Sequence, residues 1–274
     1  MLEALRRFEE ISGEPLTWAM NPNSGQPEAI GPDGGLANVR RWPADVFERF
    51  DFQMLFTGGT APEEVSPLRF VAVSRAREEG QLSYISCSVP LIWATKYSPE
   101  EFTSFVVELC NLVGPSHGYA GLAIVPHVTG FSPESVKPVF DLARRFQGVD
   151  IDLPDWHEPF LASSEGIKGV NWITVLGNRW IAALGGATAI QPRLSDAICV
   201  FEYRGGVVLQ AGKSPALGDK LAGDSLAAYR SVGAALAPVR VKTGLMMRVD
   251  SGNGGFDQAE AERWQARFDT VKPR

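Results

Sequence analysis

The sequence predicts an α+β fold, with a mixed, mainly antiparallel sheet or sheets on which capped helices pack. Three observations support this class. Hydrophobic residues make up 45% of the 274 residues, which is enough for a sizeable core. Short apolar runs of strand character recur along the chain and are separated by turn residues. Helix-start signals occur between these runs, without the strict alternation of a doubly wound fold.

The N-terminal part combines a short helix with residues 13–35, a segment rich in Gly, Pro and Asn. This composition predicts extended chain and turns. We therefore expect an N-terminal helix and arm over residues 1–36, followed by a single α+β domain over residues 37–274. A division of that domain into two closely joined halves near residues 150–165 is the alternative.

Apolar and β-branched runs bounded by turn residues predict the strands. They lie at residues 50–56, 68–74, 82–89, 119–125, 170–176, 197–203, 207–211 and 239–249. The Gly205-Gly206 turn joins two of these runs, 197–203 and 207–211, and predicts a hairpin.

Capping residues mark the helices. The clearest helix has Ser98 as N-cap, Pro99 at its first position and Glu101 to complete a capping box. A similar start at Ser132 predicts a second helix, in which Pro138 should cause a kink or a restart. Further helices are expected at residues 224–236 and 257–268, the latter with a cap at its start.

The charge balance is acidic, with 26 Lys and Arg against 32 Asp and Glu and a net charge of -6. Nucleic-acid phosphates require the opposite sign, so we expect no nucleic-acid binding and favour a basic protein partner. The start of the chain lacks the apolar run of a signal peptide, and no stretch reaches the ~18 apolar residues of a membrane span. Cys87, Cys110 and Cys199 read as buried free thiols of a reducing compartment, so we expect a cytoplasmic protein without membrane contact.

One short motif has the form of a serine hydrolase site. Residues 114–118 match G-x-S-x-G around Ser116, with His127 and His157 as candidate bases. A nucleophile elbow follows a strand and precedes a helix, whereas here a helix precedes the motif and a strand follows it. We therefore expect no catalytic residues, and a hydrolase that uses Ser116 is the alternative.

Two further patterns suggest ligand binding but have the wrong spacing. The A-G-K-S sequence at residues 211–214 places Lys213 and Ser214 as in a phosphate-binding loop, but Gly206 lies one residue too far away and a proline follows. The acidic cluster that includes His157 could supply metal ligands, but it matches no known metal-binding loop. Neither a cofactor nor a metal is expected.

The clearest asymmetry of charge lies in residues 146–167, which contain five acidic residues and no Lys or Arg. Trp156 lies among them, and an aromatic ring surrounded by carboxylates is typical of a surface that binds a basic partner. The alternative is a solvated loop in which Trp156 packs inward. Trp42 and Trp18 are weaker candidates for such an anchor. The predicted partner-binding residues are Asp150, Asp152, Asp155, Trp156, Glu158 and Trp42.

Three stretches resemble a bacterial family of type VI secretion immunity proteins, namely residues 166–186, 202–219 and 229–240. Residues 117–125 and the helix before them fit the same family, so the resemblance covers most of the chain beyond the N-terminal arm. It implies a non-enzymatic antidote that binds a cognate type VI toxin, which in some cases is a nuclease. The stretches are Gly turns and apolar strands, so they identify a fold and transfer no site residue. An adaptor that loads the toxin without inhibiting it is a further alternative.

Overall fold

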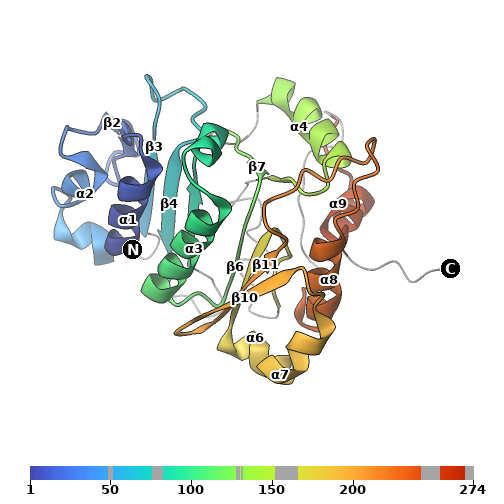
Figure 1. The fold of residues 1–274 in the computed structure, drawn as a ribbon. Coiled ribbons are helices and arrows are strands. Elements are labelled where there is room, and N and C mark those ends of the chain that lie inside the picture. The colour runs from blue at the N-terminus through green and yellow to red at the C-terminus, as the bar shows by residue number, and fades with distance from the viewer. Residues whose placement is uncertain are drawn as a thin grey trace. The chain divides into compact units, whose positions relative to one another are not determined.

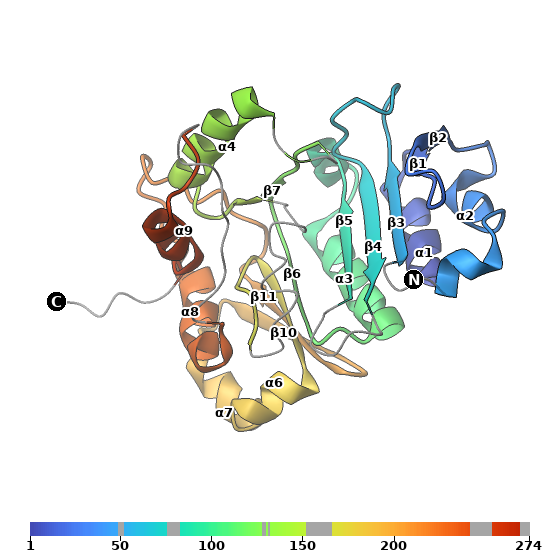
Figure 2. The ribbon, with the colours of Figure 1, turned by 180° about the vertical axis from the view of Figure 1, so that it is seen from behind.

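The computed structural model describes residues 1–48, 52–75, 83–127, 130, 132–151, 166–241 and 254–268 (Figures 1 and 2). These residues fall into two compact units. Unit 1 contains Met1–Ser98 and Val125–Gly130, and unit 2 contains Pro99–Ile124 and the described residues from 132 onwards. The predicted α+β class is confirmed, because each unit combines helices with an antiparallel sheet.

Unit 1 contains a five-stranded antiparallel sheet in the order β2-β1-β3-β4-β5. Its strands are β1 (Trp18–Met20), β2 (Pro27–Ala29), β3 (Phe52–Thr57), β4 (Arg69–Ser74) and β5 (Tyr84–Ser88). Its helices are α1 (Leu2–Ser12), α2 (Gly34–Val39) and the 3-10 turns η1 (Ala44–Glu48) and η2 (Leu91–Thr95). The Gly- and Pro-rich segment therefore forms extended chain and turns as expected, and its strands β1 and β2 belong to this sheet.

Helix α1 shows why this part of the sequence folds as it does. Ala4, Leu5 and Phe8 recur at helical spacing and are completely buried, and the Phe8 ring lies 5.7 Å from that of Phe70 on β4. The opposite face carries charged residues that pair with one another along the helix, such as Arg6 with Glu10. Burial of the apolar face, at about 2–3 kcal/mol for a fully buried Phe, holds the helix on the sheet.

Unit 2 contains a four-stranded antiparallel sheet in the order β10-β11-β9-β6, and a short parallel pair, β7 with β8. Its strands are β6 (His117–Ala120), β7 (Ala123–Ile124), β8 (Asp150–Ile151), β9 (Ile173–Gly177), β10 (Ile198–Tyr203) and β11 (Gly206–Ala211). Its helices are α3 (Pro99–Val113), α4 (Pro133–Arg145), α6 (Asn178–Ala183), α7 (Ala187–Ile190), η4 (Gln191–Arg193), α8 (Ala227–Leu236), η5 (Ala237–Val239) and α9 (Gln258–Gln265).

The core of unit 2 lies around β9, in which every residue is buried. Helix α3 contributes Phe102, whose ring stacks on Trp172 at 5.8 Å, and helix α8 contributes Tyr229, which is 2% exposed. A second cluster joins α4 to the α9 region, with the rings of Phe140 and Phe256 4.6 Å apart. The two clusters fix the sheet and its helices as one unit.

The predicted hairpin and the predicted cap at the start of the helix 257–268 are confirmed. Strands β10 and β11 pair across a two-residue turn, with Tyr203 opposite Gly206. At the start of α9, the Asp257 carboxylate accepts a hydrogen bond from the Glu260 N–H, and the Glu260 carboxylate accepts one from the Asp257 N–H. Local signals suffice at both places because the partners are close in sequence.

Three expectations about elements need correction or lie partly outside the described residues. The run 119–125 is two strands, β6 and β7, because the chain bends at Gly121, where an added Cβ would lie 2.3 Å from the Asn171 amide oxygen. Helix α4 continues through Pro138 without a restart. The proline is exposed, and burial of the apolar residues before and after it stabilises the helix by more than the one lost hydrogen bond costs. Most of the run 239–249 lies outside the described residues.

Candidate functional site

Trp42 lies in the core of unit 1. It is 8% exposed, and its ring stacks on Phe56 at 6.0 Å with an angle of 13° between the planes. Its indole N–H donates a hydrogen bond to the Glu28 carboxylate at 3.2 Å. Trp42 therefore stabilises the core of unit 1. That it also contacts a partner stays a prediction.

Glu28 is a partly buried carboxylate that sequence reasoning missed. It lies on β2 and accepts side-chain hydrogen bonds from Asn21 (2.8 Å), Asn38 (2.7 Å) and Trp42 (3.2 Å). Burial alone would raise the pKa of the Glu28 carboxyl, but these three donors outweigh it and hold that pKa below its usual value. The carboxylate thus ties β2 to α2.

Asp150 is the first residue of β8 and is 7% exposed. Its carboxylate lies 3.8 Å from the guanidinium of Arg267, and its N–H donates to the Leu122 carbonyl at 2.8 Å. The described contacts of Asp150 are therefore internal to unit 2. The other predicted partner-binding residues of this segment lie outside the described residues, namely Asp152, Asp155, Trp156 and Glu158.

The G-x-S-x-G motif joins α3 to β6, in the order that the sequence predicts. The Ser116 hydroxyl accepts a hydrogen bond from the Trp180 indole at 3.1 Å. The ring of the neighbouring residue, His117, contacts β9 instead, because its Nδ1 lies 3.0 Å from the Val175 carbonyl oxygen. Among the described residues, Ser116 therefore has no histidine as a hydrogen-bond partner. His157, one of the two candidate bases, lies outside the described residues.

The A-G-K-S sequence forms the end of β11 and a turn. The Gly212 carbonyl accepts hydrogen bonds from the Trp172 indole (3.1 Å) and the Gln210 amide (3.0 Å), while Lys213 and Ser214 are exposed. The next helix, α8, begins only at Ala227. A phosphate-binding loop requires a helix directly after the motif, so this arrangement does not form one.

The described part of the chain offers no group of three or more metal-ligating side chains. None of its helices is long and apolar enough to cross a membrane. All three cysteines are free, as expected, but their burial differs from the expectation. Cys110 is buried, Cys87 is half-buried, and Cys199 is exposed because it lies on the outer strand β10.

His117 supplies a pH-dependent contribution to stability. Its Nε2 atom is buried without a hydrogen-bond partner, and burial lowers the pKa of the ring to about 4 although its Nδ1 contacts the Val175 carbonyl. In the unfolded chain the His117 ring takes up a proton with a pKa of about 6.5, whereas in the folded protein it does so only near pH 4. The free energy of unfolding should therefore fall as the pH drops from about 6.5 to about 4, by about 3 kcal/mol in total. Urea unfolding at several pH values measures this loss. His117→Asn and His117→Phe should remove this part of the pH dependence, and an unchanged slope in both variants would contradict the assignment.

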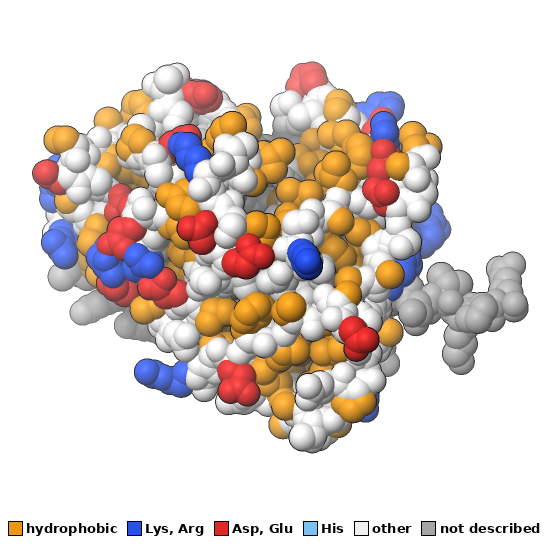
Figure 3. Space-filling view, viewed as in Figure 1, with side chains coloured by type: hydrophobic (Ala, Val, Ile, Leu, Met, Phe, Trp, Pro, Cys, Tyr) orange, Lys and Arg blue, Asp and Glu red, His pale blue; other side chains and the backbone are white. Residues whose placement is uncertain are grey.

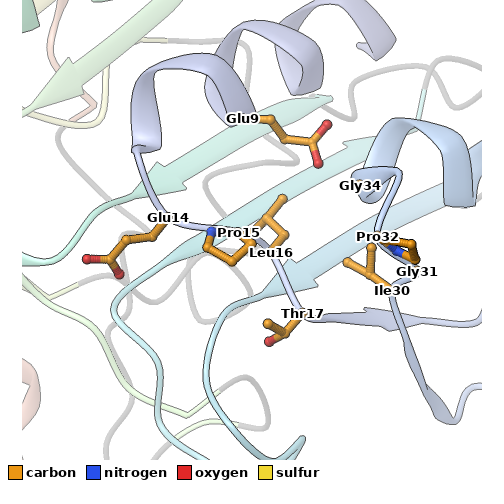
Figure 4. A pocket seen from close by; sticks show the side chains of 9 residues that line it. All are labelled: Glu9, Glu14, Pro15, Leu16, Thr17, Ile30, Gly31, Pro32 and Gly34. Atoms are coloured by element: carbon orange, nitrogen blue, oxygen red, sulfur yellow. The ribbon is translucent and has the colours of Figure 1, made fainter.

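A pocket of about 210 Å³ lies in unit 1 between the end of α1 and the start of α2 (Figure 4). The Glu9 carboxylate points from α1 towards α2 and accepts hydrogen bonds from the backbone N–H groups of Gly35 (2.6 Å) and Leu36 (3.3 Å). Glu14 is exposed at the edge of the pocket, and its side chain points away from the other lining residues. The remaining lining is mostly apolar and consists of Pro15, Leu16, Thr17, Ile30, Gly31, Pro32 and Gly34.

This Glu9 pocket combines carboxylates with apolar walls. Each oxygen of the Glu9 carboxylate keeps a lone pair beyond the backbone hydrogen bond that it accepts. The volume suits a single side chain rather than a large ligand. A Lys or Arg side chain, with an apolar stem and a cationic end, matches both features. Sequence reasoning missed the pocket because its walls come from separate turns.

The described residues thus form an α+β protein with a net charge of -6 and a small pocket that carries the Glu9 carboxylate. The family model TsiV, described as type VI immunity for VRR-NUC, matches residues 1–268, and the chain belongs to this family. The resemblance to type VI immunity proteins is thereby confirmed, and it extends to the N-terminal segment.

A solved structure supports the same assignment. The fold is similar to that of a chain described as Pseudomonas aeruginosa T6SS protein PA0821, with a TM-score of 0.83 and 25% sequence identity. The similarity covers 98% of this chain and 76% of that one. The comparison with curated proteins gave no match.

Proposed function

We propose that this protein binds a toxin with a VRR-NUC nuclease domain in the cytoplasm and inhibits it stoichiometrically, without catalysing a reaction. The observation that carries the proposal is the family match over residues 1–268. The described residues support it further, because none of their histidines hydrogen-bonds to Ser116 and no helix directly follows the A-G-K-S turn. A nuclease and its nucleic-acid substrate meet in the cytoplasm, so the inhibitor is needed there.

Charge supports a direct contact between the two proteins. A nuclease needs basic groups to bind phosphate, and a protein with a net charge of -6 is attracted to such a surface. The Glu9 pocket and the acidic segment with Asp152, Asp155, Trp156 and Glu158 are the proposed points of contact. A pocket that receives one basic side chain would add the buried anchor that rim charges alone do not provide.

The test is co-expression of this chain with the toxin encoded beside it, followed by purification of the complex and a nuclease assay. We expect rescue of growth, a stable complex and loss of DNA cleavage at a one-to-one ratio. A complex that retains full nuclease activity would instead support the adaptor. If no toxin of the producing strain bound the protein, the proposal would be wrong.

Ser116→Ala separates the inhibitor from the alternative hydrolase. The hydroxyl only accepts a hydrogen bond from the Trp180 indole, so its loss should cost about 1 kcal/mol of stability and leave inhibition unchanged. Titration of nuclease activity with the variant and the wild type measures this. A hydrolase would lose its turnover completely, and a variant that folds normally but no longer protects cells would favour that reading.

Glu14→Lys tests the pocket. The change reverses a charge at the rim while leaving the Glu9 hydrogen bonds in place, so association with the toxin should slow by about 3- to 10-fold at low salt, and less at high salt. The matched control is Glu262→Lys, which alters the net charge equally at an exposed position of α9. Stopped-flow association rates decide the outcome. Equal slowing by both variants would show that only the net charge matters.

A further inference from the structure

Strand β10 is the outer strand of the unit 2 sheet, and in the described chain it pairs only with β11 (Figure 1). Four consecutive residues of this strand are exposed, including Val200 at 47% and Phe201 at 38%. Hydrophobic side chains gather over this part of the molecule in the lower half of Figure 3. The strand I-C-V-F-E-Y has no Pro or Lys, which commonly protect an open edge from pairing, and Glu202 is its only charged residue.

The backbone of β10 offers a row of hydrogen-bonding groups on its outer side. The Gly212 N–H donates to the Ala197 carbonyl at 3.0 Å, so Ala197 faces β11. Orientation alternates along an antiparallel pair, which also turns the N–H and C=O groups of residues 199, 201 and 203 towards β11. Those of Val200 and Glu202 therefore point away from the sheet, where an added strand could bind them.

We propose that two copies of the chain pair through β10, antiparallel to each other, and join the two four-stranded sheets into one of eight strands. A two-fold axis at Val200 places Val200 of one copy opposite Val200 of the other, with both in hydrogen-bonding positions. The same contact covers both exposed edges at once and places each Phe201 beside Cys199 of the other copy. A symmetric contact of this kind needs no second complementary surface.

The charges at the ends of the strand select this register. With the axis at Val200, Glu202 lies opposite Ile198 of the other copy. Arg204, in the hairpin turn after β10, comes to the same end as Asp196 of the other copy, which lies in the turn before β10. Both Asp196 and Arg204 are exposed and available for such a pair. A shift of the axis to Glu202 would place two carboxylates directly opposite each other, which is unfavourable.

Sedimentation equilibrium of the wild-type protein alone tests the pairing. We expect a reversible species of twice the 29.8 kDa chain mass. Val200→Pro should give a monomer with an unchanged circular dichroism spectrum, since the lost N–H faces outward. Leu221→Ser, which removes the most exposed apolar side chain of a loop and keeps the Leu221 N–H bond to Asp219, is the control and should stay dimeric.

A charge exchange tests the register without relying on proline. Asp196→Arg should weaken the dimer by about 3- to 10-fold by placing two cations opposite each other, and the double variant D196R/R204D should restore it. F201C should form a disulfide with Cys199 of the other copy on oxidation, and C199S/F201C should not, because these positions face each other at about 4.5 Å between Cα atoms.

A wild-type protein that stays monomeric would overturn the proposal, as would a dimer that neither Val200→Pro nor Asp196→Arg affects. If the protein were monomeric and Val200→Pro weakened toxin binding, the edge would instead bind the toxin. The dimer is measured on the protein alone, without the toxin. A negative result therefore overturns only the pairing and leaves the proposed inhibition of the toxin untouched.

Discussion

Replacement of Arg267 by Met is expected to lower the free energy of unfolding by about 3–5 kcal/mol. The guanidinium is 6% exposed and lies 3.8 Å from the Asp150 carboxylate. It also donates hydrogen bonds to the backbone carbonyls of Gln147 (2.8 Å) and Trp264 (3.0 Å) and lies over the Trp264 ring. Without it, Asp150 would remain buried with its charge uncompensated.

Burial explains the direction of the pKa shift at Arg267. Removal from water lowers the pKa of the guanidinium to about 10, and the nearby Asp150 carboxylate opposes this shift. The group thus stays charged at neutral pH, and the ion pair is present under physiological conditions. The loss in Arg267→Met should therefore appear across the neutral range, as a lower midpoint in urea with an unchanged slope.

A double-mutant cycle gives the control. Asp150→Asn removes the charge but keeps the shape, and the double variant D150N/R267M should be more stable than the sum of the two single losses predicts, by about 1–3 kcal/mol. Strictly additive effects would show that the two groups do not interact. If Asp150 also contacted the toxin, the folded Asp150→Asn variant would bind the toxin more weakly. If Asp150 contacts only unit 2, the variant should inhibit the toxin as well as the wild type does.

The sequence predicts those parts of the fold that depend on neighbours in the chain. The residues that close the β10–β11 turn, Tyr203 and Gly206, and those of the Asp257–Glu260 cap are three positions apart, so their turn and capping chemistry is visible in the sequence. The strand β9 is also visible, because a continuous apolar run needs burial on both faces. These elements fix the fold class.

The candidate site depends on contacts that the sequence does not display. Asp150 and its partner Arg267 are 117 positions apart (267 − 150), so a run of acidic residues gives no sign that one of them is paired inside the unit. Trp42 gives no sign either that its indole N–H binds Glu28. In the Glu9 pocket, a helix carboxylate meets the backbone of residues 35 and 36, which only the folded chain brings together.

For the outer strand β10, the sequence predicts the strand but not its exposure. Its apolar run and its hairpin turn predict β10 correctly, but a uniform run reads as a buried strand, whereas four of its residues are exposed. Periodicity reveals which face of a strand is buried only when polar residues alternate with apolar ones. The exposure of Val200 and Phe201 was therefore accessible only from the sheet order.

Gly206→Ala is expected to destabilise the protein by about 3 kcal/mol or more, because the backbone leaves no room for a side chain. An added Cβ would lie 1.9 Å from the Leu176 carbonyl oxygen and 2.9 Å from the Gly177 Cα atom on the neighbouring strand β9. Relief would require β11 to move away from β9 at the centre of the sheet.

Gly169→Ala is the matched control for this prediction. No atom lies within 4 Å of the added Cβ at that position, and its backbone is not in the left-handed region. The change should be neutral or stabilise the protein by about 0.4–1 kcal/mol through the unfolded state. Thermal and urea unfolding of both variants measure the difference. Equal effects would show that the β9–β11 contact is looser than the distances indicate, and a marked loss in Gly206→Ala alone would confirm that backbone proximity dictates glycine there.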